Sequence, residues 1–226
     1  SSHGIYLDKF QKKIKDLSKS KYAILTSSGS SALHVSLLTL GVLKNDLVIM
    51  PSFTFIATAN SIKLTGADPW LFDVSKSDLN LDLDLLEKEL EKNTYFKKDG
   101  YSYHKKNKKR VSAVIIVFAL GHPGDLKSLK KISKKNNLKI VIDAAAALGS
   151  TINNQPLGNF NIDMIVFSFN GNKNITSGGG GAIITNNSKY YKLSKQFSSN
   201  AKVGFRYLHN KIGFNYKMNN IQAAIG

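Results

Sequence analysis

Short, almost entirely apolar segments alternate with helical patterns along most of this chain, and no other feature limits the possible folds as strongly. The segment 111–118 is apolar at nearly every position, which is typical of a parallel strand buried on both faces. Strands are predicted at 22–26, 47–50, 70–74, 111–118, 139–143, 162–168 and 182–185. Strands separated by helices predict an α/β fold in which helices sandwich a mostly parallel sheet.

Periodicity and capping residues predict the helices between those strands. Phe10, Ile14 and Leu17 share one face of a first helix. The segment 31–40 is apolar almost all round, which predicts a helix buried on every side. The remaining helices are predicted from about 55 to 64, after the cap Asp82 and after the cap Asp125.

Composition excludes several classes of protein. The chain has no cysteine, so disulfide scaffolds, thiolate zinc sites and cysteine nucleophiles are excluded, and no metal site is expected. No apolar run approaches the ~18 residues of a membrane-spanning helix. The first residues show no signal-peptide pattern. We therefore expect a cytoplasmic protein without a membrane partner.

The net charge of +17 at first suggests a nucleic-acid partner. However, Arg110 and Arg206 are the only arginines, and arginine is the residue that binds phosphates and guanines in a bidentate manner. The lysines are spread along the chain, so we interpret them as a solvated surface and expect no nucleic-acid partner. We interpret the Lys-rich segment 94–110 as a basic insertion loop. The alternative is that Tyr101 and Tyr103 form a base-stacking patch there.

Candidate functional residues follow the predicted strands, where α/β sheets bind their ligands. The segment Ser27–Ser31 joins a strand to a helix, as in a phosphate-binding turn, although any such turn favours Gly and Ser. Asp143 ends a strand and either faces a site or caps a helix. Lys173 lies five residues after Ser168 and shortly before four glycines. That setting predicts a buried, nucleophilic amine, whereas most lysines of this chain are surface residues.

Taken together, these groups are what pyridoxal 5′-phosphate requires. The lysine would carry the cofactor, the carboxylate would keep the pyridine nitrogen protonated, and the turn would hold the phosphate.

The same segments resemble the DegT/DnrJ/EryC1/StrS family of sugar aminotransferases. The matching motifs are Ser28–Leu33, Pro51–Asn60, Ile142–Ala145, Ser168–Gly181 and Gly213–Met218. The resemblance implies the large domain of a fold-type I transferase that depends on pyridoxal phosphate. The implied reaction transfers an amino group, with glutamate as donor, to a nucleotide-linked sugar. The Ser168–Gly181 motif looks most like the LegC branch, which aminates a 4-keto-6-deoxy-N-acetylhexosamine nucleotide on routes to surface glycans.

The resemblance also implies a role for each matching residue. Lys173 is expected to carry the cofactor and to move a proton to the sugar carbon, and Asp143 to pair with the pyridinium nitrogen. Phe55 is expected to stack on the cofactor ring. The phosphate is expected to contact Gly29, Ser30, Ser31 and the Ser168 hydroxyl, together with Asn215 from a neighbouring subunit. That last contact implies a symmetric homodimer with shared sites.

Two departures from the family pattern leave an alternative open. Ala146 stands where the family has Gln or Glu beside the cofactor's phenolic oxygen. The family's chains begin earlier and continue past 222–226 into a small C-terminal domain, so we expect residues 1–226 to be the large domain, incomplete at both ends. The alternative is a catalytically impaired member that acts as a cofactor-binding or assembly domain. The sister dehydration reaction is disfavoured, because its enzymes have histidine in place of Lys173.

Overall fold

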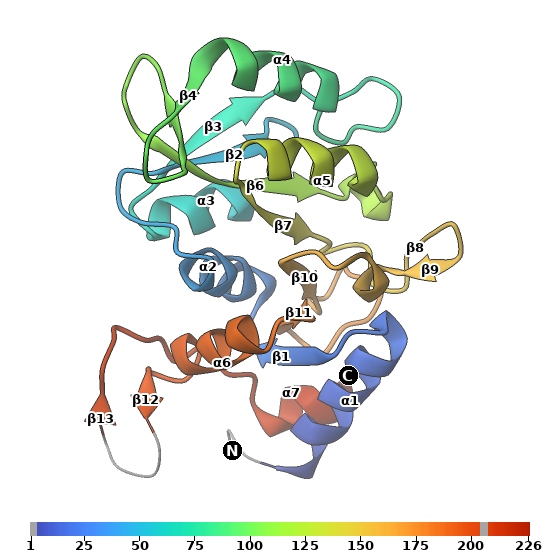
Figure 1. Cartoon of the computed structure of the whole chain (residues 1–226). Helices are drawn as coiled ribbons and strands as arrows, with labels where there is room; N and C mark the ends of the chain where they lie inside the picture. Colours follow the sequence, from blue (N-terminus) through green and yellow to red (C-terminus); the bar gives the residue numbers. More distant parts are fainter. Residues whose placement is uncertain (1–3, 204–207) are drawn as a thin grey trace.

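The computed structural model describes residues 4–203 and 208–226, within which nine strands form one mixed sheet (Figure 1). The central order is β1-β11-β10-β7-β6-β2-β3, and the strands β10, β7, β6, β2 and β3 are mutually parallel. β11 is antiparallel to both β1 and β10, so β1 points the same way as the parallel set. The bounds are β1 Tyr22–Thr26, β2 Leu47–Pro51, β3 Asp68–Phe72, β4 Thr94–Phe96, β5 Ser102–His104, β6 Arg110–Val117, β7 Lys139–Asp143, β10 Met164–Ser168 and β11 Gly181–Thr185.

Helices cover both faces of the sheet, as the apolar strands require (Figure 1). One face packs against α2 (Gly29–Thr39), α3 (Ala57–Leu64) and α6 (Ser188–Phe197). The other packs against α1 (Ile5–Ser18), α4 (Leu83–Asn93), α5 (Leu126–Lys135) and α7 (Asn220–Ile225). The predicted α/β class, with a mostly parallel sheet between helices, is confirmed. Two short ribbons lie outside the sheet: β8 (Thr151–Ile152) with β9 (Gln155–Pro156), and β12 (Lys202–Val203) with β13 (Leu208–His209).

Most predicted elements are present, with shifted ends. The predicted strand at 70–74 lies two residues earlier, and the helix expected from about 55 begins at Ala57. Asp82 and Asp125 cap α4 and α5 as predicted, through bonds from backbone amides to their carboxylates. The prediction for Leu17 is wrong, because it is 48% exposed while Phe10, Ile14 and Ser18 are buried. The buried stripe of α1 advances by four residues at each step, which turns Leu17 outward.

The interpretation of 94–110 as a loop is wrong. The segment folds into the β4–β5 hairpin, and β5 then pairs with the start of β6. Tyr95 and Tyr103 lie opposite each other in the hairpin, with ring centroids 6.2 Å apart. Ser102 is fully buried and donates to the Asn136 carbonyl oxygen at 2.8 Å. Cross-strand aromatic pairing and this buried bond stabilise strands in a segment whose lysines mask the β pattern.

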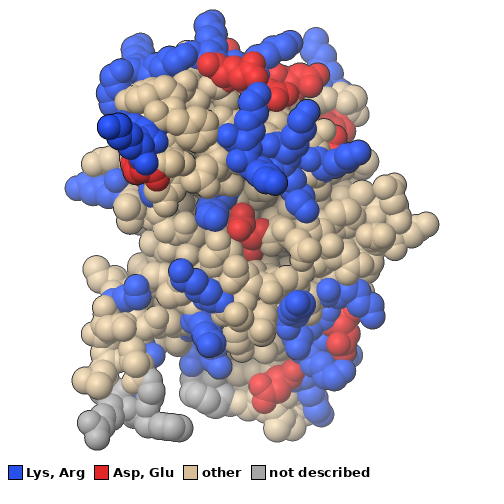
Figure 2. Space-filling model, in the orientation of Figure 1, with Lys and Arg blue, Asp and Glu red and all other residues tan. Residues whose placement is uncertain are grey.

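The aromatic rings of the hairpin already contact cations of the same chain. Lys97 Nζ lies 3.8 Å from the ring centroid of Tyr103, and the Arg110 guanidinium carbon lies 4.9 Å from that of Tyr101. Arg110 also pairs with Asp46. On the face drawn in Figure 2, basic side chains are scattered, with acidic ones beside them. The second arginine, Arg206, lies outside the described residues.

None of the helices in the described residues is long and apolar enough to span a membrane.

Candidate active site

The turns that follow β1, β2, β7 and β10 meet at one edge of the sheet. Because these strands point the same way, their carboxyl ends are neighbours. Along β7 and β10, Val141 and Val166 belong to the core under α2 and α3. Side chains two residues apart share a face of a strand, so Asp143 and Ser168 point to that same face. The sheet therefore places the predicted carboxylate and phosphate-binding hydroxyl side by side.

Asp143 is buried and bonded through both carboxylate oxygens. Its side chain accepts the Thr58 hydroxyl from α3 at 2.9 Å and the backbone amide of Ala145 at 3.2 Å. Burial raises the pKa of Asp143, while these two bonds and the positive charge of Lys173 oppose the rise. The alternative that Asp143 caps a helix is wrong, because a turn and not a helix follows it.

The turn between β1 and α2 has the geometry of an anion site, and part of it is already engaged. Ser28 caps α2, and its hydroxyl accepts the backbone amide of Ser31 at 3.0 Å. A Cβ at Gly29 would lie 2.9 Å from Ser168 Cβ and 3.2 Å from Ser168 Oγ. Only glycine therefore lets the start of α2 approach β10 this closely. Ser30 is exposed at the same helix N-terminus, where amides point away from the helix.

Lys173 lies in the segment that leaves β10 beyond Ser168. Its backbone amide donates to the Asn170 carbonyl oxygen at 3.0 Å, which forms a turn. The prediction of a buried amine is wrong for this structure, because the side chain is half-buried between exposed Asn172 and Asn174. The positive charge of Lys173 is one of the influences that lower the pKa of Asp143.

Phe55 lies one helical turn before Thr58, on the segment between β2 and α3. It is 77% exposed, so it does not belong to the core. Thr58, three residues further along, bonds to Asp143, so the backbone that carries the Phe55 ring is tied to the carboxylate. A flat ligand between them is compatible with that arrangement.

Asn215 lies on the segment that returns along β1, and it is exposed. The Ser27 amide donates to the Tyr216 carbonyl oxygen at 2.7 Å, so this segment lies against the turn between β1 and α2. Phe214 and Tyr216 stack on each other and both contact the His34 ring. Successive side chains of an extended segment point to opposite sides. Because Phe214 and Tyr216 both point toward His34, Asn215 between them points away from the body of the protein.

Ala146 is half-buried in the turn after β7. Its carbonyl oxygen would be 2.5 Å from a Cβ at Gly121, so the backbone of this turn packs tightly on the loop after β6. The methyl side chain provides no hydrogen bond at the position where the family has Gln or Glu.

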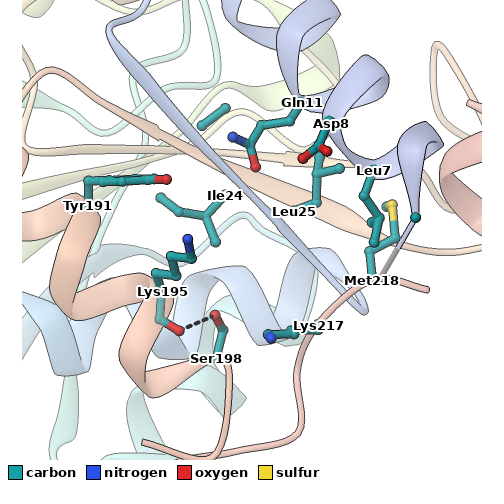
Figure 3. A pocket seen from close by; sticks show the side chains of 12 residues that line it. Leu7, Asp8, Gln11, Ile24, Leu25, Tyr191, Lys195, Ser198, Lys217 and Met218 are labelled. Carbon is teal, nitrogen blue, oxygen red and sulfur yellow. Dashed lines mark hydrogen bonds between the residues drawn. The ribbon is translucent and has the colours of Figure 1, made fainter. Parts of the chain in front are cut away.

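A separate hollow of about 350 Å³ lies beside β1, away from these groups (Figure 3). Residues from α1, β1, α6 and the 217–218 segment line it, among them Gln11, Ile24 and Lys195. None of the predicted site residues contributes to it. The candidate site is the open cluster at the strand ends.

Thr58 is the member of this cluster that sequence reasoning missed. Its signal was present in the sequence, since it lies seven residues after Pro51, the end of β2, within the Pro51–Asn60 motif. A threonine inside a helix is ordinary, however, and nothing along the chain indicates that its partner is Asp143, far away in sequence.

Comparison with known proteins agrees with this geometry. Residues 1–226 match the model of the DegT/DnrJ/EryC1/StrS aminotransferase family. The chain is 36% identical to GDP-perosamine synthase of Escherichia coli O157:H7 over all of its length and 57% of the relative's. It is 30% identical to UDP-4-amino-4,6-dideoxy-N-acetyl-beta-L-altrosamine transaminase of Campylobacter jejuni, covering 99% of this chain and 56% of the relative.

The crystal structure of NtdA from Bacillus subtilis with bound cofactor PMP has a similar fold. It superposes with a TM-score of 0.84 at 31% identity, covering 99% of this chain and 47% of that one. The chain thus spans about half the length of the relatives that it matches. The matched sequence and the shared fold lead to one conclusion: this chain belongs to the DegT/DnrJ/EryC1/StrS aminotransferase family.

Proposed function

We propose that the protein of which this chain is the large domain is a cytoplasmic, pyridoxal phosphate-dependent sugar aminotransferase. The observation that carries the proposal is the buried Asp143 carboxylate, which the Thr58 hydroxyl and the Ala145 amide hold at the end of β7. A buried carboxylate that burial drives toward neutrality needs a cationic partner, and a protonated pyridine nitrogen is one. The cofactor is pyridoxal 5′-phosphate.

The residues of the site fit the parts of this cofactor. The turn at Gly29 and Ser30, the N-terminus of α2 and the Ser168 hydroxyl suit its phosphate. Ser168 Oγ accepts only a long bond from the Asn170 amide, at 3.4 Å, so its proton is available to a phosphate oxygen. Phe55 suits one face of the ring. When bound, the cofactor supplies an electron sink that makes the proton on the adjacent substrate carbon acidic.

Lys173 is the base and acid of this proposal. Its amine would be the group that moves the proton between C4′ of the cofactor and the sugar carbon. Asp143 holds the pyridine nitrogen protonated and does not itself move a proton.

The proposed substrate is a nucleotide-linked 4-keto-6-deoxy sugar, aminated at C4, with glutamate as amino donor. The names of the perosamine synthases and the altrosamine transaminase support a nucleotide-linked amino sugar as product. Within this class we propose the N-acetylhexosamine of the LegC branch, on the form of the Ser168–Gly181 segment. The sites are proposed to be shared in a homodimer, with Asn215 contacting the neighbouring subunit's phosphate.

Borohydride reduction of the whole protein loaded with pyridoxal phosphate tests the assignment of Lys173. The expected result is a stable mass adduct on the peptide that contains Lys173, and its complete loss in Lys173→Ala. Lys189→Ala, an exposed lysine on α6, is the control and retains the adduct. An adduct that persists in Lys173→Ala contradicts the proposal.

Turnover assays separate the substrates. The whole protein is incubated with glutamate and either a UDP-linked 4-keto-6-deoxy-N-acetylhexosamine or a GDP-linked 4-keto-6-deoxyhexose, and 2-oxoglutarate is measured. Faster turnover of the UDP sugar supports the N-acetylhexosamine as the substrate. Faster turnover of the GDP sugar contradicts that choice and supports the GDP-linked hexose. A protein that binds the cofactor but turns over neither sugar supports the impaired-member alternative, which Ala146 favours.

A further inference from the structure

We propose that Thr58 is a positioning residue for Asp143, and that a Thr54–Thr58 hydroxyl chain fixes the carboxylate relative to the Phe55 ring. The proposal rests on the proposed function only where it concerns cofactor binding. The contact itself is independent of that function.

Thr58 is placed as a dedicated partner and not as a packing residue. It is fully buried on α3, and its hydroxyl donates to Asp143 Oδ2 at 2.9 Å. Threonine is a poor helix former, and a threonine inside a helix ordinarily bonds to the carbonyl oxygen one turn earlier. The hydroxyl of Thr58 is instead directed across to β7. If the position needed only an apolar side chain of this size, valine would fill it without burying a hydroxyl. We therefore infer that the hydroxyl is there to donate to the carboxylate of Asp143.

The two bonds to Asp143 fix the plane of its carboxylate. Oδ2 accepts from Thr58 and Oδ1 accepts from the Ala145 amide. One donor on each oxygen prevents rotation about the last bond of the side chain. Each oxygen retains acceptor capacity, so the carboxylate can still accept an N–H from a ring that lies beside it.

The direction of the hydroxyl chain follows from proton counting. Thr58 has one hydroxyl proton, which goes to the carboxylate, since the carboxylate can only accept. Thr54 Oγ1 lies 2.8 Å from Thr58 Oγ1, so Thr54 donates in that pair. Phe55 lies between these two threonines in sequence, and the chain of bonds therefore ties the backbone carrying the aromatic ring to the carboxylate at the end of β7.

Loss of the Thr58 hydroxyl is expected to raise the pKa of Asp143. Burial already raises the pKa of this carboxyl, and the Thr58 bond lowers it. Without the bond, the neutral form is populated at higher pH, and a neutral carboxyl pairs weakly with a pyridinium cation. The loss therefore weakens cofactor binding through Asp143, although Thr58 has no cofactor contact of its own in the proposal.

The test compares Thr58→Val, which keeps the volume, with Thr58→Ser, which keeps the hydroxyl. Ser61→Ala is the matched control, because Ser61 is a buried hydroxyl on the same helix that donates to the Thr58 carbonyl and not to Asp143. The first readout is the pH titration of the Asp143 carboxyl carbon by NMR in cofactor-free whole protein. Its signal is assigned by its disappearance in Asp143→Asn.

We expect the titration midpoint to rise in Thr58→Val and to remain at the wild-type value in Thr58→Ser and Ser61→Ala. The second readout is the affinity for pyridoxal phosphate, which should fall about tenfold or more in Thr58→Val, as expected for a bond to a charged group, and recover in Thr58→Ser. Where Thr58→Val fails to fold, Thr58→Ala provides the same comparison with less bulk.

An unchanged midpoint in the folded Val or Ala variant overturns the proposal. A tenfold loss of pyridoxal phosphate affinity in both Thr58→Val and Thr58→Ser also overturns it. If the midpoint shifts as expected but wild-type protein binds no pyridoxal phosphate, the coupling of Thr58 to Asp143 is supported and the proposed function fails.

Discussion

At the scale of single residues, the site depends on one glycine that allows two segments to touch. Gly29 begins α2, and its missing side chain makes room for Ser168 at the end of β10. The glycine is needed here for space and not for an unusual backbone angle, since its φ lies outside the left-handed range. The effect of replacing it can therefore be attributed to a single contact.

We predict that Gly29→Ala weakens pyridoxal phosphate binding about tenfold or more, because the new methyl group would lie within 3.0 Å of Ser168 Cβ and push the two phosphate-binding elements apart. Equilibrium dialysis measures the change. In the double variant Gly29→Ala/Ser168→Gly the opposing side chain is gone, so the clash should be relieved. The midpoint of urea unfolding should then return to the wild-type value, whereas the proposed bond from Ser168 to the phosphate stays lost. A Gly29→Ala protein with wild-type affinity would show that the turn does not hold the phosphate.

At the scale of elements, the position of Asn215 depends on how its segment packs on α2. Phe214 and Tyr216 both contact the ring of His34, with centroids 4.9 and 6.0 Å away. His34 is 2% exposed. Burial lowers the pKa of His34 below 6.5, with the Leu64 carbonyl opposing the shift. The folded state therefore holds the neutral ring.

This shift predicts a loss of stability in mild acid. Between the folded pKa of His34 and its unfolded value of 6.5, the unfolded chain binds more protons, so the free energy of unfolding falls as pH drops below about 6.5. The slope is at most about 1.4 kcal/mol per pH unit. Urea unfolding at about pH 7.5 and about pH 5.5 measures it. The difference between the two pH values should shrink in His34→Phe, and an unchanged difference would assign the acid sensitivity to other groups.

The β4–β5 hairpin provides a test of the nucleic-acid alternative. Lys97 lies over the Tyr103 ring and Arg110 over the Tyr101 ring, so each ring already has a cation of the same chain as a partner. We predict weak, non-saturating binding of single-stranded oligonucleotides that disappears at moderate salt and does not change in Tyr103→Ala. Fluorescence anisotropy across a salt series measures it. Saturable binding that Tyr103→Ala abolishes would restore the alternative.

Sequence reasoning succeeded for elements and side chains whose position follows from the strand pattern. Asp143 and Ser168 were identifiable because each ends an apolar strand, and parallel strands bring such ends together. It failed for Thr58, whose role depends on a contact between distant segments. It failed for the half-burial of Lys173, which depends on what packs over its loop. It also missed the hairpin at 94–110, where lysines on exposed faces concealed an aromatic cross-strand pair.

At the scale of the whole molecule, shared sites make a prediction that no single chain can test. If Asn215 serves the neighbouring subunit, a mixed dimer of Lys173→Ala and Asn215→Ala chains contains one site with both defects and one intact site. Mixing the two inactive whole proteins under exchange conditions should then restore about a quarter of wild-type turnover, because half the dimers are mixed and each has one site. No recovery, despite exchange shown by mass spectrometry, would place Asn215 in its own subunit's site.

The sheet order has a consequence for synthesis. The strand β1 leaves the ribosome early, yet its sheet partner is β11, at Gly181–Thr185. At translation rates of 5–20 residues per second, the nascent chain waits on the order of ten seconds before that partner exists. Throughout this interval α2, buried on nearly every side in the finished protein, lacks its final cover. The buried residues of α2, at the start of which the phosphate is proposed to bind, therefore stay exposed for longer than the short connection to β1 would suggest.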